Sequence, residues 1–406
     1  MYIPRLLEKS LREGLKHFPA VFVGGPRRAG KTMLVRHLLK DASYVLLDEM
    51  NIRRSAAEDP QGFLDEHKPP VILDEIQNVP ELLSYVKARI DRNKKPGQWI
   101  LTGSQQWALM KGVGETLAGR IAILHLYPFS LAEISKNTNE PPLDTAGYLR
   151  YLKNATQKNS APISPGKWIM NGGYPEVVLA AKKNRPLWFS SYMQTYIDRD
   201  VRGNLRDIHL RDFERFVRLL AARTGQELQI SSLAGDVGVT VPTIKAWLTL
   251  LEASGLIFFL MPYYKNFGKR IIKAPKCYFM DTGLVAYLVG LQDERHALGG
   301  PMAGALFETA CVSEIYKRLS LWGAETSMYY YRSCDGLEVD VLIDNAGSLC
   351  PIEIKLSSTL DPDRVRNLQK WRRLAKHDKE AAFVISTSSQ TSRVSTKIQN
   401  VHYSWL

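Results

Sequence analysis

AVFVGGPRRAGKT, residues 20–32, is the stretch that decides the fold expected for this chain of 406 residues. A short apolar run, which predicts a buried strand, leads through Gly25 and four further residues to the triplet Gly30-Lys31-Thr32. This spacing between a strand and a helix is the P-loop pattern. Because glycine has no Cβ, the backbone can turn its N–H groups towards phosphate oxygens, and the helix that follows adds its positive end. A plain glycine-rich turn is the alternative, and the motifs that follow weigh against it.

The P-loop pattern gives its two polar side chains separate tasks. Lys31 is expected to contact the β- and γ-phosphates of ATP, and the Thr32 hydroxyl is expected to hold Mg²⁺. The residues expected to bind the nucleotide are Gly25, Pro26, Arg27, Arg28, Ala29, Gly30, Lys31, Thr32 and Met33.

Apolar runs rich in β-branched residues recur through the first third of the chain. They lie at residues 20–24, 44–48, 71–74, 99–103 and 121–126. They lack polar alternation and are separated by helical stretches, which predicts a parallel sheet with helices on both faces. The expected fold class of residues 1–140 is therefore α/β.

Two acids stand at the end of the run VILDE. Asp74 is expected to hold Mg²⁺ through water, and Glu75 is expected to be the general base that activates the attacking water. An acidic junction between a strand and a loop, without a catalytic role, is the alternative.

Two further polar residues are candidates for catalysis. Ser104 follows the next strand and could touch the γ-phosphate or position water, with Thr102 or Gln105 as second choices. Arg120 closes the sequence LAGR and could stabilise transition-state charge as an arginine finger, in cis or in trans from a neighbouring subunit. The trans interpretation requires a homo-oligomer. A structural ion pair of Arg120 remains open as the third interpretation.

The order of P-loop, extra strand, DE pair, polar strand end, LAGR and YPFSLAEI resembles the AAA+ ATPases. In particular it is similar to a prokaryotic group of about 400 residues whose second half is a poorly characterised domain. The resemblance implies a sheet of the P-loop NTPase type (AAA+/ASCE) with the strand order 5-1-4-3-2.

The middle of the chain predicts a helical connector or lid at residues 141–225 and a winged helix at residues 226–282. Two helices joined by a turn near Thr240 are followed by a β-ribbon whose segment 262–276 carries five cations and no acid. In a nucleic-acid reader Thr243 and Lys245 would face the major groove and the ribbon lysines would face phosphate. A lid or a protein-interaction unit is the alternative.

The last part, residues 283–406, contains a predicted hairpin whose turn follows Asp344. If Asp344 pairs with Leu349, Asp340 lies opposite Glu353, and Lys355 shares the face of Glu353 by the period of two. Two carboxylates and a lysine on one face suit a metal-dependent phosphodiesterase.

This constellation, with Glu308 from the preceding helix as a third carboxylate, resembles the PD-(D/E)xK nuclease core. The resemblance implies a restriction-endonuclease-like α/β domain with Glu308, Asp340 and Glu353 as metal ligands and Lys355 as a catalytic residue. An ordinary hairpin with a salt bridge between Glu353 and Lys355, or a retained but inactive core, is the alternative.

Composition limits the class of protein further. The net charge of +13 favours a polyanionic partner, for which we expect nucleic acid, DNA rather than RNA. The longest apolar run, residues 256–261, is too short for a membrane span, and no signal-peptide pattern opens the sequence. Four cysteines without C-x-x-C spacing suggest reduced thiols. We therefore expect a cytoplasmic protein without a membrane partner.

Three functions compete on these grounds. The first is an ATPase that gates a nuclease. The second is an ATP-dependent switch whose C-terminal domain is inactive as a nuclease and only binds DNA. The third is a signalling ATPase with a protein partner.

Overall fold

The computed structural model describes most of the chain, which divides into two compact units. The described residues are 2–103, 116–136, 144–155, 163–180, 185–197, 201–204, 209–264, 273–323, 327–359, 365–376, 381–388, 393–395 and 397–406. The first unit comprises Met1–Phe129, Ala253–Gly255 and Ser320–Ala324, and the second comprises Ser130–Glu252, Leu256–Leu319 and Glu325–Leu406. The division into four domains with boundaries at residues 140, 225 and 282 stays a prediction.

The first unit is built on a five-stranded parallel sheet. Its order is β2-β3-β4-β1-β5, which confirms the order 5-1-4-3-2 that the resemblance implied. All neighbouring strands run parallel. The strands are β1 (Ala20–Gly24), β2 (Ser43–Leu46), β3 (Val71–Asp74), β4 (Trp99–Thr102) and β5 (Ile121–His125).

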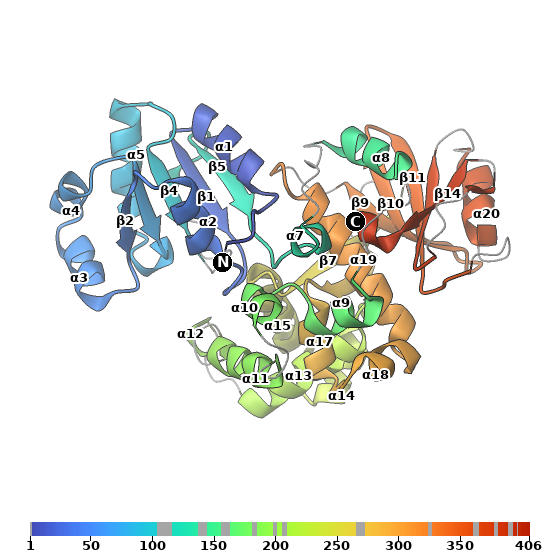
Figure 1. The fold of residues 1–406 in the computed structure, drawn as a ribbon. Helices are drawn as coiled ribbons and strands as arrows, with labels where there is room; N and C mark the ends of the chain where they lie inside the picture. The colour runs from blue at the N-terminus through green and yellow to red at the C-terminus, as the bar shows by residue number, and fades with distance from the viewer. Residues whose placement is uncertain are drawn as a thin grey trace. The chain divides into compact units, whose positions relative to one another are not determined.

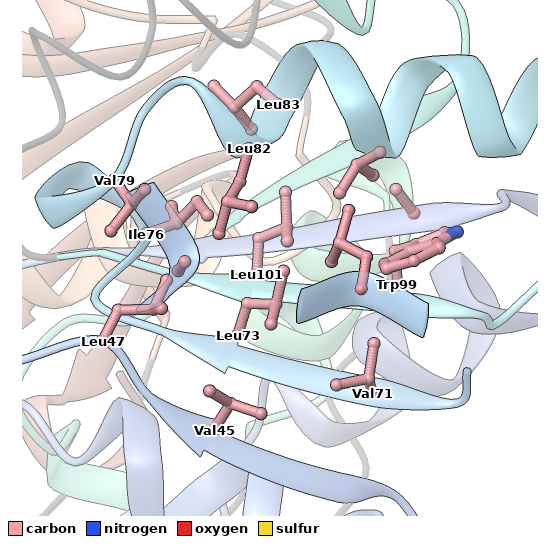
Figure 2. Packing of buried hydrophobic residues seen from close by; sticks show 14 of the residues in the cluster. Val45, Leu47, Val71, Leu73, Ile76, Val79, Leu82, Leu83, Trp99 and Leu101 are labelled. Atoms are coloured by element: carbon pink, nitrogen blue, oxygen red, sulfur yellow. The ribbon is translucent and has the colours of Figure 1, made fainter. Parts of the chain in front are cut away.

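Helices cover both faces of this sheet, because side chains of each strand alternate between two apolar clusters. Val71 and Leu73 join one cluster with α5, whereas Ile72 joins the other with α2. Figure 2 shows the first cluster, in which Val71, Leu73 and Leu101 of the strands lie below Leu82 at the start of α5. The helices of this unit are α1 (Glu8–His17), α2 (Lys31–Leu38), α3 (Met50–Glu58), α4 (Pro60–Glu66), η1 (Ile76–Asn78) and α5 (Leu82–Arg92).

The second unit begins with helices (green in Figure 1). They are α7 (Leu131–Ile134), α8 (Thr145–Lys153), α9 (Pro165–Asn171), α10 (Pro175–Leu179), α11 (Arg185–Tyr196), α12 (Arg202–Asn204) and α13 (Leu210–Ala222).

The next segment has the order helix, strand, two helices, two strands. After α13 come β6 (Gln226–Glu227), α14 (Ile230–Val237), α15 (Val241–Ala253), β7 (Ile257–Pro262) and β8 (Lys276–Phe279). The predicted pair of helices is thus confirmed, and Thr243 N–H donates to Thr240 Oγ1 at 3.3 Å at the start of α15. Strand β8 pairs antiparallel with both β6 and β7.

The C-terminal part continues the same sheet. Its order is β13-β14-β12-β11-β10-β9-β7-β8-β6, so the sheet crosses the predicted boundary at residue 282. The parallel pairing of β7 with β9 makes this connection. The elements are α17 (Thr282–Leu288), α18 (Glu294–Gly299), α19 (Ala303–Leu319), β9 (Met328–Arg332), β10 (Glu338–Asn345), β11 (Ser348–Lys355), α20 (Arg366–Ala375), β12 (Ala382–Ser386), β13 (Arg393–Ser395), β14 (Ile398–His402) and η5 (Tyr403–Trp405).

The predicted hairpin has the expected register. Asp344 pairs with Leu349, and Val341 pairs with Ile352. The turn is closed by Gly347 N–H, which donates to Asp344 Oδ1 at 2.8 Å. In the described residues, no helix is long and apolar enough to cross a membrane.

Candidate functional site

The P-loop backbone follows the carboxyl end of β1 and depends on its two glycines. Gly25 has φ +140°, and a Cβ there would lie 2.0 Å from the carbonyl oxygen of Leu126. Gly30 has φ +97° and stands directly before α2. Both positions therefore require glycine. The loop they form places the start of α2 where its N–H groups can receive phosphate.

Lys31 lies inside this loop. Its Nζ donates to the carbonyl oxygens of Gly25 and Pro26, each at 3.0 Å, and only 6% of the residue is exposed. The lysine thus holds its ammonium group within the turn that the glycines shape.

Asp74 gathers hydroxyl groups from three other elements. Its Oδ2 accepts hydrogen bonds from Thr32 Oγ1 and from Tyr44 OH, both at 2.7 Å. Its Oδ1 accepts from Thr102 Oγ1, and the residue is 1% exposed. Burial, together with the hydrogen bond to Asp74, raises the pKa of Tyr44. The phenol therefore stays protonated and donates to the carboxylate.

The oxygens of Thr32 and Asp74 form the donor set that Mg²⁺ prefers. They come from the first turn of α2 and the end of β3, and they lie 2.7 Å apart. The residues present therefore fit a magnesium ion.

Glu75 occupies an uncommon backbone conformation. Its φ is +60°, in the left-handed region, which costs a non-glycine residue about 1 kcal/mol or more and is typical of functional positions. The N–H of Glu75 donates to Thr102 Oγ1 at 3.3 Å, and its Oε2 accepts from Gln77 Nε2. The left-handed turn at Glu75 thus follows Asp74 directly, and the hydrogen bond from Gln77 helps to orient the carboxylate of Glu75.

Arg5 is a site residue that the sequence reasoning missed. Its guanidinium donates to the carbonyl oxygen of Ala29 in the P-loop at 2.8 Å and to that of Tyr127 at 2.7 Å. The same group lies 4.5 Å from the centre of the Phe129 ring. An arginine near the start of a chain carries no recognisable motif, so only the fold could show that it supports the P-loop.

His125, at the end of β5, was also missed. It stands opposite Gly24 in the pairing of β1 with β5. Burial lowers its pKa to about 4, so the ring is neutral at physiological pH.

Arg120 lies at the amino ends of the parallel strands, whereas the P-loop lies at their carboxyl ends. Its carbonyl oxygen accepts from the N–H of Ala20, at the start of β1, whereas the P-loop follows the end of that strand. Five residues of strand separate the two edges by about 17 Å. The cis interpretation of Arg120 is therefore wrong.

The side chain of Arg120 makes the structural ion pair that was the third interpretation. Its Nε lies 2.6 Å from Asp91 Oδ1 and lowers the pKa of that carboxyl.

The remaining predicted residues of this site are placed as follows. Arg27 is half-buried, while Arg28 and Met33 are exposed. Ser104 and Gln105 lie outside the described residues. Of the candidates at the end of β4, the structure shows Thr102, bonded to Asp74.

In the second unit, Asp340 and Glu353 lie on neighbouring strands at the end of the paired register. Asp340 Oδ2 accepts from the N–H of Ile354 at 2.7 Å. Glu353 Oε1 lies 2.6 Å from Lys355 Nζ. Burial and the neighbouring carboxylate of Glu353 raise the pKa of Asp340.

Glu308, Glu338, Asp340 and Glu353 form an acidic cluster. Lys276 of β8 also belongs to it, although the sequence reasoning did not single out this lysine for the site. Its Nζ lies 3.3 Å from Glu308 Oε1 and 2.7 Å from Glu338 Oε1, and 5% of the residue is exposed. Tyr278 OH donates to Glu308 Oε1 at 2.6 Å. Although burial alone lowers the pKa of Lys276, the carboxylate of Glu308 and those around it more than offset this, so the lysine is charged.

The residues of this acidic cluster do not fit a metal ion as they stand. Among the described residues, no three His, Cys, Asp or Glu side chains are arranged to hold one. The carboxylate of Glu308 nevertheless lies close enough to raise the pKa of both Asp340 and Glu353, while Lys276 and Tyr278 engage it. The ligand set of Glu308, Asp340 and Glu353 stays a prediction. One observation points the other way: Glu353 Oε2 is buried and has no hydrogen-bond partner.

The parallel sheet, its strand order, the P-loop and the carboxylate beside it define a P-loop domain of the AAA ATPase type. Residues 17–135 match the family described as AAA domain. Residues 166–295 match a domain of unknown function (DUF8612), and residues 303–406 match another (DUF4143).

Similar chains include two mycobacterial proteins and one solved structure from Pyrococcus abyssi. Uncharacterized proteins of Mycobacterium tuberculosis and Mycobacterium bovis are each 26% identical over 350 residues, which cover 86% of this chain and 73% of theirs. The Walker-type ATPase of Pyrococcus abyssi is 17% identical, with a TM-score of 0.46, and the match covers 71% of this chain and 96% of that one.

Proposed function

We propose that this protein binds ATP with Mg²⁺ at its P-loop, hydrolyses it, and uses the reaction to act on nucleic acid. The hydrogen bond between Thr32 and Asp74, beside the lysine of the loop, supports the ATPase proposal most directly. It brings together the Thr32 hydroxyl and the Asp74 carboxylate, the two groups expected to bind magnesium, beside the loop that would hold the phosphates of ATP.

Each residue has a role in this proposal. The backbone N–H groups of the P-loop and the start of α2 receive the phosphates, and Lys31 neutralises their charge. Thr32 and Asp74 hold Mg²⁺, which offsets charge on the phosphate oxygens when bound. Glu75 accepts a proton from the attacking water.

The test compares Lys31→Ala with the wild type in ATP binding and phosphate release. Lys40→Ala, which removes an exposed lysine just beyond α2, is the matched control. We expect Lys31→Ala to lose binding and turnover and Lys40→Ala to keep both. An equally active Lys31→Ala protein would overturn the proposed site.

The nucleic-acid part of the proposal is supported by the middle segment and by charge. The order from α13 to β8, with β8 between β6 and β7, resembles a winged helix. Lys245 of α15 is exposed, and α20 exposes Arg366, Lys370 and Arg373. Such cations neutralise phosphates, so binding should weaken steeply as salt rises.

An ATP-gated nuclease is the second candidate function. The buried and unpartnered Glu353 Oε2 favours it, since a carboxylate oxygen of this kind can bind a cation. Lys276 supports the alternative, a nuclease-like domain that binds DNA or a protein without cutting. Incubation with Mn²⁺ and mixed nucleic acids, with and without ATP, tests the two. Cleavage lost in Asp340→Ala would establish a nuclease, and no cleavage would support the switch.

A further inference from the structure

A cavity of about 670 Å³ lies in the second unit. It adjoins the acidic cluster, because Lys276 Nζ lies 5.6 Å from the centre of the ring of Tyr330, which lines the cavity. This volume falls within the range of small-ligand pockets. Its wall comes from the end of β7, from β9 and from α20. The aromatic residues that line it are Tyr263, Tyr264, Tyr330, Tyr331 and Trp371.

Several contacts hold the residues that carry these aromatic rings. Tyr263 N–H donates to the carbonyl oxygen of Tyr330 at 2.7 Å, and Tyr330 OH donates to that of Ala274 at 2.7 Å. The ring of Tyr331 meets that of Trp371 edge to face, with centroids 6.1 Å apart. Trp371 and Tyr330 are buried, whereas Tyr263, Tyr264 and Tyr331 remain half-exposed. The pocket therefore has a buried aromatic floor, made by Tyr330 and Trp371, and three partly accessible tyrosines.

The charged residues at this pocket are mainly positive. Lys273 and Arg332 line it, and both are exposed. Among the described residues that line it, Glu227 is the single acid, and it lies 3.1 Å from Arg332, which neutralises it. The pocket therefore offers flat aromatic surface next to a net positive charge.

We propose that this pocket receives the bases of a single-stranded nucleic acid, with the phosphates near Lys273. The inference rests on the proposed function and names a site for it. Base stacking on aromatic side chains strengthens binding and is tolerant of sequence, because every base has a flat π-face. A double helix fits less well because its base faces are already stacked on one another.

The test separates base contacts from backbone contacts in the full-length protein. One probe is a fluorescein-labelled oligothymidylate of about 12 nucleotides, within the site size of such binders. The other has the same length and charge but carries no bases. We expect the wild type to bind the thymidylate at least about tenfold more tightly than the abasic strand, as stacking of one or two bases requires.

Variants locate the preference. The double variant Tyr263→Leu, Tyr264→Leu should bring the two affinities together, and the matching phenylalanine variant should restore the preference because it keeps the rings. Tyr85→Leu, which removes an exposed tyrosine from the first unit, should leave the preference unchanged.

The outcomes distinguish failure of the pocket from failure of the function. Salt-dependent binding of both probes with equal affinity would overturn the stacking pocket and leave nucleic-acid binding in place. A base preference that survives the leucine double variant would also overturn the pocket. Binding of neither probe would overturn the proposed action on nucleic acid itself.

Discussion

Thr32 Oγ1 donates a 2.7 Å hydrogen bond to Asp74 Oδ2, although the two residues are 42 positions apart in the sequence. The contact joins the first turn of α2 to the end of β3. It lies at the carboxyl edge of the parallel sheet, where the strand ends and the loops that follow them come together.

The first prediction concerns Asp74. Asp74→Asn keeps the size of the side chain but removes the charge that binds a magnesium ion. We expect phosphate release to fall by about 10²-fold or more, which corresponds to the loss of about 3 kcal/mol of transition-state stabilisation. Steady-state phosphate release measures it. Turnover at the wild-type rate would contradict the role of Asp74.

The second prediction concerns the general base. Glu75→Gln should keep ATP binding and slow hydrolysis by about 10²- to 10⁴-fold, because the amide cannot accept the proton. Gln77→Leu removes the hydrogen bond to Glu75 and should lower kcat with little change in KM, as expected for a positioning residue. Fluorescent-nucleotide binding and turnover, measured in parallel, separate the two effects. A Gln77→Leu protein with only a raised KM would argue against positioning.

The third prediction concerns Arg5. Arg5→Met removes two hydrogen bonds to backbone carbonyls and leaves buried acceptors unsatisfied, which costs about 2–4 kcal/mol of unfolding free energy. Affinity for ATP should fall too, because Ala29 belongs to the P-loop. Denaturant unfolding and nucleotide binding provide the readouts. Arg12→Met, at an exposed position of α1, is the control and should change neither.

The fourth prediction concerns Lys276. Lys276→Met leaves the partly exposed carboxylates of Glu308 and Glu338 without their cation, and we expect about 1–3 kcal/mol lower stability. Mn²⁺ should then raise the unfolding temperature of this variant, since the freed carboxylates can bind it. Lys317→Met breaks another buried pair, with Glu314 at 2.8 Å, and should not respond to Mn²⁺. Equal Mn²⁺ effects in both variants would refute the internal-cation role of Lys276.

The fifth prediction concerns pH. The pKa of His125 falls from 6.5 to about 4 on folding, so the unfolded chain binds an extra proton between these values. The contribution of His125 to stability is complete above pH 6.5 and is lost as the pH falls towards 4. His125→Asn should therefore have a flatter stability profile than the wild type across this window. Parallel profiles, from chemical unfolding at several pH values, would contradict the assignment.

The P-loop and the position of Asp74 beside it could be predicted from the sequence because their information is local. A P-loop fixes its own geometry within eight residues, and Asp74 follows from its position at the end of an apolar run. The hairpin of β10 and β11 was predictable for the same reason, since the turn at Asp344 sets the register.

The unpredicted features depend on contacts between distant segments. Arg5, Lys276 and His125 act through partners that no spacing rule connects to them. The edge of the sheet on which Arg120 lies follows from strand direction, which a motif such as LAGR does not encode. The acidic cluster shows the same limit. The hairpin register predicted that Asp340 lies near Glu353, but it could not predict that Lys276 of β8 contacts the cluster.

The pairing of Met261 with Tyr329 and of Pro262 with Tyr330 has a consequence for how the second half of the chain can be handled. A single β-sheet contains strands from two segments that match separate families, residues 166–295 and 303–406. If the two segments were produced separately, β7 and β9 would each have an unpaired edge, and such edges tend to aggregate. The two segments should therefore be produced together, and a structural change in one should be transmitted to the other through the shared sheet.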